Sequence, residues 1–112
     1  MAPPPGATRE TYIGESEGRA IGTVHLDRKG ARCELSWTVA PEARGQGRGK
    51  ALVAAAIALA RASAPDANAV DLVAMIKPEN QASQRIAQSL GFRLEAEEDG
   101  LMLWLWHGTA GI

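Results

Sequence analysis

The chain has 112 residues, which is enough for one domain with one core and too few for two. Hydrophobic residues make up 46% and charged residues 22%, so disorder over the whole chain is excluded. The formal net charge of −1 lacks the basic excess of proteins that wrap nucleic acid. Cys33 is the single cysteine, which excludes an internal disulfide and suits a reducing compartment. The first residues form no secretory signal and no apolar stretch spans a bilayer, so the expected location is cytoplasmic, without membrane contact.

The N-terminal part of the chain predicts a flexible lead-in followed by three strands. Residues 1–9 contain three consecutive prolines, a composition typical of a flexible or polyproline-like segment. Strands are predicted at Tyr12–Glu17, Arg19–Asp27 and Arg32–Val39, and apolar residues occupy every second position of the third. Pro41 ends the third strand because proline has no N–H to donate. The three strands are expected to form an antiparallel meander.

After Pro41 the pattern changes to alternating helices and strands. Apolar residues three and four positions apart predict a helix that begins within a glycine-rich segment and ends near Ala62. Asn80 is suited to cap a second helix, and Gly91 to end it. The remaining strands are predicted at Val70–Ile76, Phe92–Glu97 and Leu101–Trp106, with a hairpin turn at Asp99-Gly100 between the last two.

The expected fold class is α/β (α+β), with the element order β-β-β-α-β-α-β-β around a mixed, mostly antiparallel central sheet. The strand–helix–strand unit between Arg32 and Ile76 requires two parallel strands, because such crossovers are right-handed and return to the same sheet. We therefore expect a single domain over residues 10–107, preceded by the lead-in and followed by a short tail at 108–112.

The segment Arg44–Lys50 carries the clearest chemical signal. It has glycine at alternate positions and three basic residues, and it follows a strand and opens a helix. The first helical turn has unpaired N–H groups, and glycine lets an anion approach them closely, so the segment predicts a pyrophosphate site. The spacing is that of neither a Walker A loop nor a dinucleotide-binding loop. The alternative interpretation is a basic surface turn with no ligand.

Two motifs together resemble the GNAT acyltransferase superfamily. The first is Arg44-Gly45-Gln46-Gly47-Arg48-Gly49, preceded by Val39-Ala40-Pro41. The second is Asn80, followed by a predicted helix that ends in Leu90-Gly91-Phe92. The element order agrees with the family from Arg9 to Trp106.

The resemblance implies an N-acetyltransferase that moves an acetyl group from acetyl-CoA to a primary amine by direct attack. The acceptor would be an amino sugar nucleotide, a small amine or a protein N-terminus. The family places the pyrophosphate on the loop amides and the pantetheine arm beside the preceding strand. The implied acetyl-CoA-binding residues are Trp37, Thr38, Val39, Arg44, Gly45, Gln46, Gly47, Arg48, Gly49, Lys50 and Asn80. No metal is expected, since no cluster of ligating residues has metal-binding spacing.

The chain departs from the family pattern in two ways. Many members have a tyrosine seven residues after the motif Asn and some have a Glu five residues before it, where this chain has Ala87 and Met75. The family also places a strand and two helices before the meander, and only the proline-rich lead-in occupies that place here. A homodimer or a partner protein is therefore expected to complete the acceptor site. The alternative function is a non-catalytic acyl-CoA-binding module or a subunit of a larger assembly.

Glu34 and His25 are the candidate catalytic bases. Glu34 lies on the polar side of the third strand, where it is either a base or an ordinary solvent-facing carboxylate. His25 lies on the neighbouring strand, where it is either a base or an exposed histidine without a role. Cys33 alternates with Trp37 on the apolar side and is expected to be a packed core thiol rather than a nucleophile.

Overall fold

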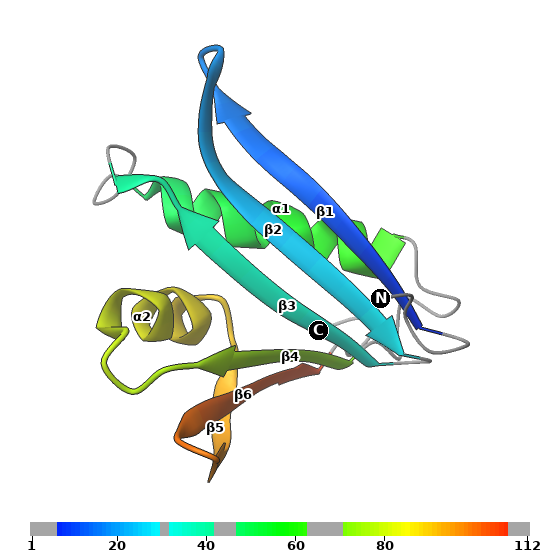
Figure 1. Cartoon of the computed structure of the whole chain (residues 1–112), viewed down its shortest axis with the longest axis vertical. Coiled ribbons are helices and arrows are strands. Elements are labelled where there is room, and N and C mark those ends of the chain that lie inside the picture. The colour runs from blue at the N-terminus through cyan, green and yellow to red at the C-terminus, as the bar shows by residue number, and fades with distance from the viewer. Residues whose placement is uncertain (1–6, 30–31, 42–46, 63–70, 108–112) are drawn as a thin grey trace.

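The computed structural model describes residues 7–29, 32–41, 47–62 and 71–107 (Figure 1). These residues form six strands and two helices in the predicted order, which confirms the mixed α and β fold class. The elements are β1 (Ala7–Ser16), β2 (Arg19–Lys29), β3 (Arg32–Val39), α1 (Arg48–Ala62), β4 (Asp71–Ile76), α2 (Gln81–Ser89), β5 (Arg93–Glu98) and β6 (Leu101–His107).

All six strands form one sheet with the strand order β1-β2-β3-β4-β6-β5. The first three strands pair as the predicted antiparallel meander, and β4, β6 and β5 also pair in antiparallel fashion. Strands β3 and β4 are parallel, as the crossover through α1 requires. The sheet therefore has a single parallel junction, which lies between its two halves.

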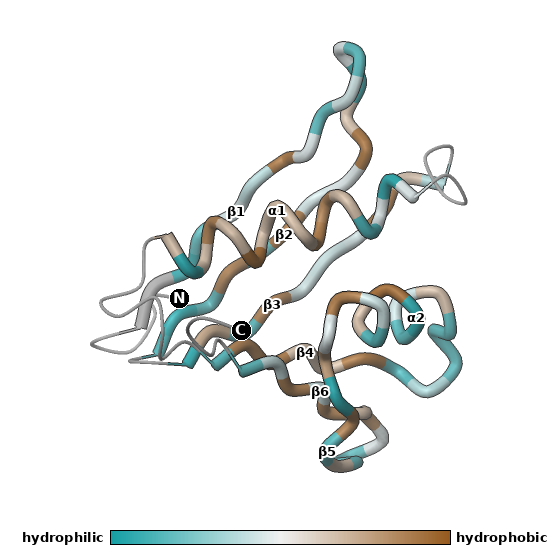
Figure 2. The backbone as a smooth tube through the Cα atoms, turned by 180° about the vertical axis from the view of Figure 1, so that it is seen from behind, coloured by the Kyte–Doolittle hydropathy of each residue, from teal (hydrophilic) through white to brown (hydrophobic). Residues whose placement is uncertain are grey.

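The core lies between the sheet and α1. Leu26, Leu35 and Cys33 are almost completely buried on one face of β2 and β3, and α1 packs on these two strands (Figure 2). The face of α1 toward the sheet includes the buried alanines Ala56 and Ala60, whose small side chains let the helix approach closely. Burial raises the pKa of the Cys33 thiol, so the prediction of a packed core cysteine is confirmed.

The predicted start of the first strand is wrong. Strand β1 begins at Ala7, so the last three residues of the predicted lead-in belong to the sheet. The pairing of Ala7 with Lys29 extends the β1–β2 ladder, and Arg9 Nε donates to Asp27 Oδ1 at 2.7 Å across it. Because these residues lack an apolar alternation, only their pairing with β2 identifies them as strand. Residues 1–6 and 108–112 of the predicted lead-in and tail lie outside the described residues.

Other element boundaries differ from the prediction by only a few residues. Strand β2 continues to Lys29, where a turn was expected from Arg28. Strands β5 and β6 each end one residue later than predicted, and β5 also begins one residue later, at Arg93. Val70, the predicted start of the fourth strand, lies outside the described residues. The cap at Asn80 is confirmed, because its side-chain oxygen accepts a hydrogen bond from the Ser83 N–H at 3.1 Å.

Two carboxylates, one in β1 and one in β2, make the stability of the domain depend on pH in the acid range. The hydrogen bond from Arg9 lowers the pKa of Asp27, and hydrogen bonds from Tyr12 and then Arg28 lower the pKa of Glu10. Because both pKa values are lowered in the folded state, their contribution is present above about pH 4 and is lost as the pH falls through the folded values. We expect Asp27→Asn to lose less free energy of unfolding than the parent on acidification, as measured by urea unfolding.

A matched pair of variants controls this experiment. Arg9→Gln removes the partner of the same carboxylate and is expected to reproduce the flatter pH dependence of Asp27→Asn. Arg93→Gln removes an exposed arginine of β5 and should keep the parent's pH dependence. A parent-like pH dependence for both Asp27→Asn and Arg9→Gln would contradict the prediction.

Candidate functional site

Strands β3 and β4 separate halfway along their length. They pair from Arg32 with Asp71 up to Leu35 with Ala74, and the pairing ends there although both strands continue. Figure 1 shows the two strands diverging, with α2 in the fork between them. A cavity of about 290 Å³ lies at this gap. It is lined by Leu35, Ser36 and Trp37 of β3, by Ala74, Met75 and Ile76 of β4, and by Lys77, Asn80 and Ser83.

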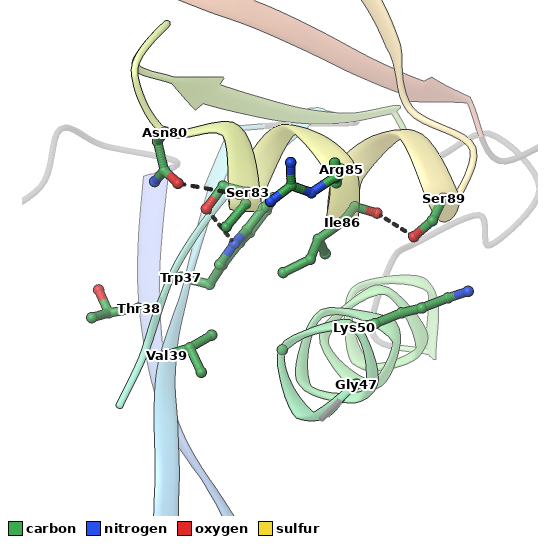
Figure 3. Close-up of a pocket in the computed structure, with 12 residues that line it drawn as sticks. Trp37, Thr38, Val39, Gly47, Lys50, Asn80, Ser83, Arg85, Ile86 and Ser89 are labelled. Atoms are coloured by element: carbon green, nitrogen blue, oxygen red, sulfur yellow. Dashed lines mark hydrogen bonds between the residues drawn. The ribbon is translucent and has the colours of Figure 1, made fainter. Parts of the chain in front are cut away.

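A larger cavity of about 620 Å³ lies beside the gap, between the end of β3, the start of α1 and one face of α2 (Figure 3). Trp37, Asn80 and Ser83 line both cavities, so the two are neighbours along this row of residues. The larger cavity is also lined by Thr38, Val39, Gly47, Gly49, Lys50, Ala82, Arg85, Ile86 and Ser89. Together the two cavities offer an elongated ligand a path from the surface into the sheet.

The start of α1 forms one wall of the larger cavity. The Ala51 N–H donates to the Gly47 carbonyl at 3.0 Å, the first hydrogen bond of the helix, so the preceding N–H groups have no partner within the helix. A Cβ added at Gly49 would lie 2.9 Å from Cδ1 of Ile86 and 3.2 Å from Cγ2 of Val39. Glycine at this position therefore lets the helix start pack tightly against β3 and α2, within reach of an anion in the cavity.

Trp37 lines both cavities and links β3 to α2. Its ring N–H donates to the Ser83 hydroxyl at 3.2 Å, which ties β3 to α2 (Figure 3). Asn80 uses its side-chain oxygen to cap α2, so the expected contact of this residue with a ligand is left to its amide nitrogen. Both residues have a structural role as well as a place on the cavity wall.

The structure brings most of the predicted acetyl-CoA-binding residues together. Seven line the larger cavity: Trp37, Thr38, Val39, Gly47, Gly49, Lys50 and Asn80. Arg48 is half-buried in the first turn of α1 and does not line the cavity. The predicted residues Arg44, Gly45 and Gln46 lie outside the described residues.

Sequence reasoning missed several lining residues, and the polar ones among them include Ser36, Ser83 and Arg85. Ser83 lies one helical turn after Asn80, so helical spacing from the motif asparagine could have indicated it. Arg85 lies on the face of α2 that also carries Ala82 and Ser89, and the same spacing applies. Ser36 carries no signal in the sequence, because its importance depends on where β3 and β4 separate.

The two candidate bases, His25 and Glu34, line neither cavity and lie on the face of the sheet opposite α1. His25 pairs directly with Ser36 across the β2–β3 ladder, and its Nδ1 lies 2.9 Å from the Thr11 hydroxyl. Glu34 is exposed and pairs with Val73, at a level where β3 and β4 are still joined. Among the described residues, no helix covers this face over β1, β2 and β3 (Figure 1). His25 is therefore one strand away from the gap, beside a residue that lines it.

The structure shows the positions of Ala87 and Met75, the two residues that depart from the family pattern. Ala87 lies on the buried face of α2 and is completely buried in the core, so it contributes no proton donor. Met75 is half-buried and lines the gap. Among the described residues, no three His, Cys, Asp or Glu side chains gather to hold a metal ion. In the same ranges, neither helix has the length and apolarity needed to cross a membrane.

Comparison with known proteins identifies the fold and the family. The family model for an acetyltransferase (GNAT) domain matches residues 6–93. No curated protein sequence matches the chain significantly. The chain belongs to the GNAT acetyltransferase family, whose enzymatic class is that of N-acetyltransferases.

Solved structures of acetyltransferases share the fold. The N-acetyltransferase PseH of Campylobacter jejuni, in complex with acetyl coenzyme A, has a TM-score of 0.78 at 18% identity over 90% of this chain and 69% of its own. YncA of Salmonella typhimurium, with acetyl-CoA, has a TM-score of 0.73 at 24% identity over 91% and 66%. The spermidine/spermine N-acetyltransferase SpeG of Vibrio cholerae has a TM-score of 0.71 at 16% identity over 89% and 67%. The chain thus spans about two thirds of each of these proteins.

Proposed function

We propose that this chain transfers an acetyl group from acetyl-CoA to a primary amine. The single observation that carries the proposal is the pair of adjoining cavities, which connects the basic, glycine-rich start of α1 with the gap between β3 and β4. The diphosphate would bind at the amides of the first turn of α1 and Lys50, and the pantetheine arm would lie along Trp37 and Val39. The membership in an acetyltransferase family and the acetyl-CoA complexes of two structural neighbours support this assignment.

In the proposed reaction, the amine nitrogen forms a bond to the acetyl carbon while the carbon–sulfur bond breaks. The CoA sulfur leaves as a thiolate, and the amine gives up one proton. The protein must hold the two reactants together and accept this proton. Because a strand gap opens to both faces of a sheet, we infer that the amine approaches from the face without helices, opposite α1.

We propose His25 as the group that accepts the proton, through Ser36 or a water molecule beside it. Direct partners on an antiparallel ladder share a face, so the imidazole and the Ser36 hydroxyl are neighbours. If the Nδ1–H donates to the Thr11 hydroxyl, the Nε2 atom has a free electron pair for the proton. Glu34 remains the alternative base, since it lies on the same face, two ladder pairs further from the gap.

Binding and turnover test the proposal together. Calorimetric titration of the full chain with acetyl-CoA is expected to give a dissociation constant between about 1 μM and 1 mM, the usual range of KM values for enzyme substrates. The amine panel should contain an amino sugar nucleotide, a polyamine and a peptide with a free N-terminus, with thiol release as the readout. Thiol release that requires one of these amines would support an N-acetyltransferase, and absence of acetyl-CoA binding would contradict it.

The same experiment addresses the second candidate function, a non-catalytic acyl-CoA-binding module. The observation that favours it is the buried Ala87, which stands where many family members have a tyrosine and cannot donate a proton to the leaving thiolate. Acetyl-CoA binding without turnover on any amine would support the module. Turnover by the purified chain alone would exclude it.

We further propose that a second copy or a partner protein contributes to the acceptor side. The supporting observation is the helix-free face of β1–β3, on which the apolar Ile13 is 65% exposed. Light scattering of the purified chain, with and without acetyl-CoA, would show whether a dimer forms. A catalytically active monomer would contradict the proposal.

A further inference from the structure

The larger cavity has positive charge on two walls that come from different helices. Lys50 lies in the first turn of α1, and Arg85 lies across the cavity on α2 (Figure 3). No acidic side chain lines this cavity in the described part of the chain. Within the same residues neither cation forms an ion pair, so both charges are available to a ligand.

The two cations line the larger cavity and not the gap between the strands. Trp37 and Ser83 line both cavities and therefore mark the inner end, whereas Lys50 and Arg85 line only the larger one. If the thioester end of acetyl-CoA reaches the gap, the nucleotide end of the molecule lies in the larger cavity with the two cations. Lys50 shares its wall with the first-turn amides of α1, while Arg85 is separate from them.

We propose that Arg85 binds the 3′-phosphate on the ribose of CoA and that Lys50 binds the diphosphate. This inference rests on the proposed function, since it concerns the same ligand. CoA carries two separate anionic groups at its nucleotide end, the diphosphate bridge and a phosphomonoester on the ribose, and the cavity offers two separate cations. A guanidinium donates two parallel hydrogen bonds to a phosphate, and its exposed position on α2 leaves these donors free to do so.

Titration of the full chain with CoA and with 3′-dephospho-CoA tests the assignment, because the two ligands differ only in that phosphate. At low ionic strength we expect the parent to bind CoA about tenfold more tightly than 3′-dephospho-CoA. Arg85→Gln should weaken CoA binding by about tenfold and leave 3′-dephospho-CoA within about twofold of the parent. Arg85→Lys keeps the charge and should retain part of the preference.

Lys50→Gln provides the contrasting variant. The diphosphate is present in both ligands, so this variant should weaken both by a similar factor and keep the parent's preference for CoA. Arg93→Gln removes an exposed arginine outside the cavity and should bind both ligands like the parent. Raising the salt concentration should reduce the parent's preference, because exposed charges are screened.

Three results would count against the proposal, and they can be told apart. Equal affinity of the parent for the two ligands would show that the 3′-phosphate is not recognised. A preference for CoA that persists in Arg85→Gln would assign that phosphate to another residue. Failure of the parent to bind either ligand would overturn the proposed function itself. Thermal unfolding of each variant confirms that Arg85→Gln, a change at an exposed side chain, leaves the fold intact.

Discussion

His25→Gln is expected to lower kcat/KM for the amine by about 100-fold, the lower end of what removal of a general base costs. The reason is geometric: His25 is the direct ladder partner of Ser36, which lines the gap where β3 and β4 separate. Glutamine keeps much of the size of the side chain and removes its capacity to take up a proton. The dissociation constant of acetyl-CoA should stay the same, because His25 lines neither cavity.

The pH profile separates a base from a residue that only packs. A general base contributes only while it can accept a proton, so kcat/KM of the parent should fall on acidification in a way that a residue that only packs would not produce. His25→Gln should lose this part of the profile, although ionisation of the amine acceptor still contributes to both. Thr11→Val removes the partner that orients the ring and should give a smaller loss with the pH dependence preserved.

Glu34→Gln is the matched control on the same face. Glu34 is exposed and lies where the strands are still joined, so its removal should change kcat/KM by no more than about twofold. A large loss in Glu34→Gln together with parent-like activity in His25→Gln would contradict our assignment and identify Glu34 as the base.

Gly22→Ala is expected to lower the free energy of unfolding by about 3 kcal/mol, the upper part of the range for forced overpacking. A Cβ at Gly22 would overlap the carbonyl oxygen of Thr38 and would lie 2.8 Å from Cδ2 of Leu52 and 3.2 Å from Cα of Val39. Two of these contacts are to backbone atoms, which cannot move aside as a side chain does. Strand β3 would have to shift at its end, where it lines the larger cavity, so acetyl-CoA affinity should fall as well.

Gly18→Ala serves as the control for the loss of backbone freedom. Gly18 has φ +77°, and nothing lies within 4 Å of an added Cβ. The variant should therefore lose only about 1 kcal/mol, the cost of an L-residue in the left-handed region, and keep its acetyl-CoA affinity. Urea unfolding measures both variants. A loss in Gly22→Ala no larger than in Gly18→Ala would show that the close approach of β3 to β2 is not needed.

The local sequence determined the elements and the location of the larger cavity. Alternation in Arg32–Val39 and helical spacing after Gly49 predict β3 and α1 because one face of each element must be buried. The crossover rule then predicts the parallel junction of β3 with β4. The motif glycines and Asn80 predict where a cavity lies, since they mark the starts of the two helices that line it. These are short-range features, and each depends on residues within a few turns of one another.

The tertiary structure decided the start of β1, the point at which β3 and β4 separate, and the position of Ser36 on the wall of the gap. It also placed His25 beside Ser36, although eleven positions separate them in the chain. None of these features has a local pattern, because each depends on the register between strands and on how closely α2 approaches β3. Register and helix packing are set by the summed burial of side chains from distant segments, which a single stretch of sequence does not contain.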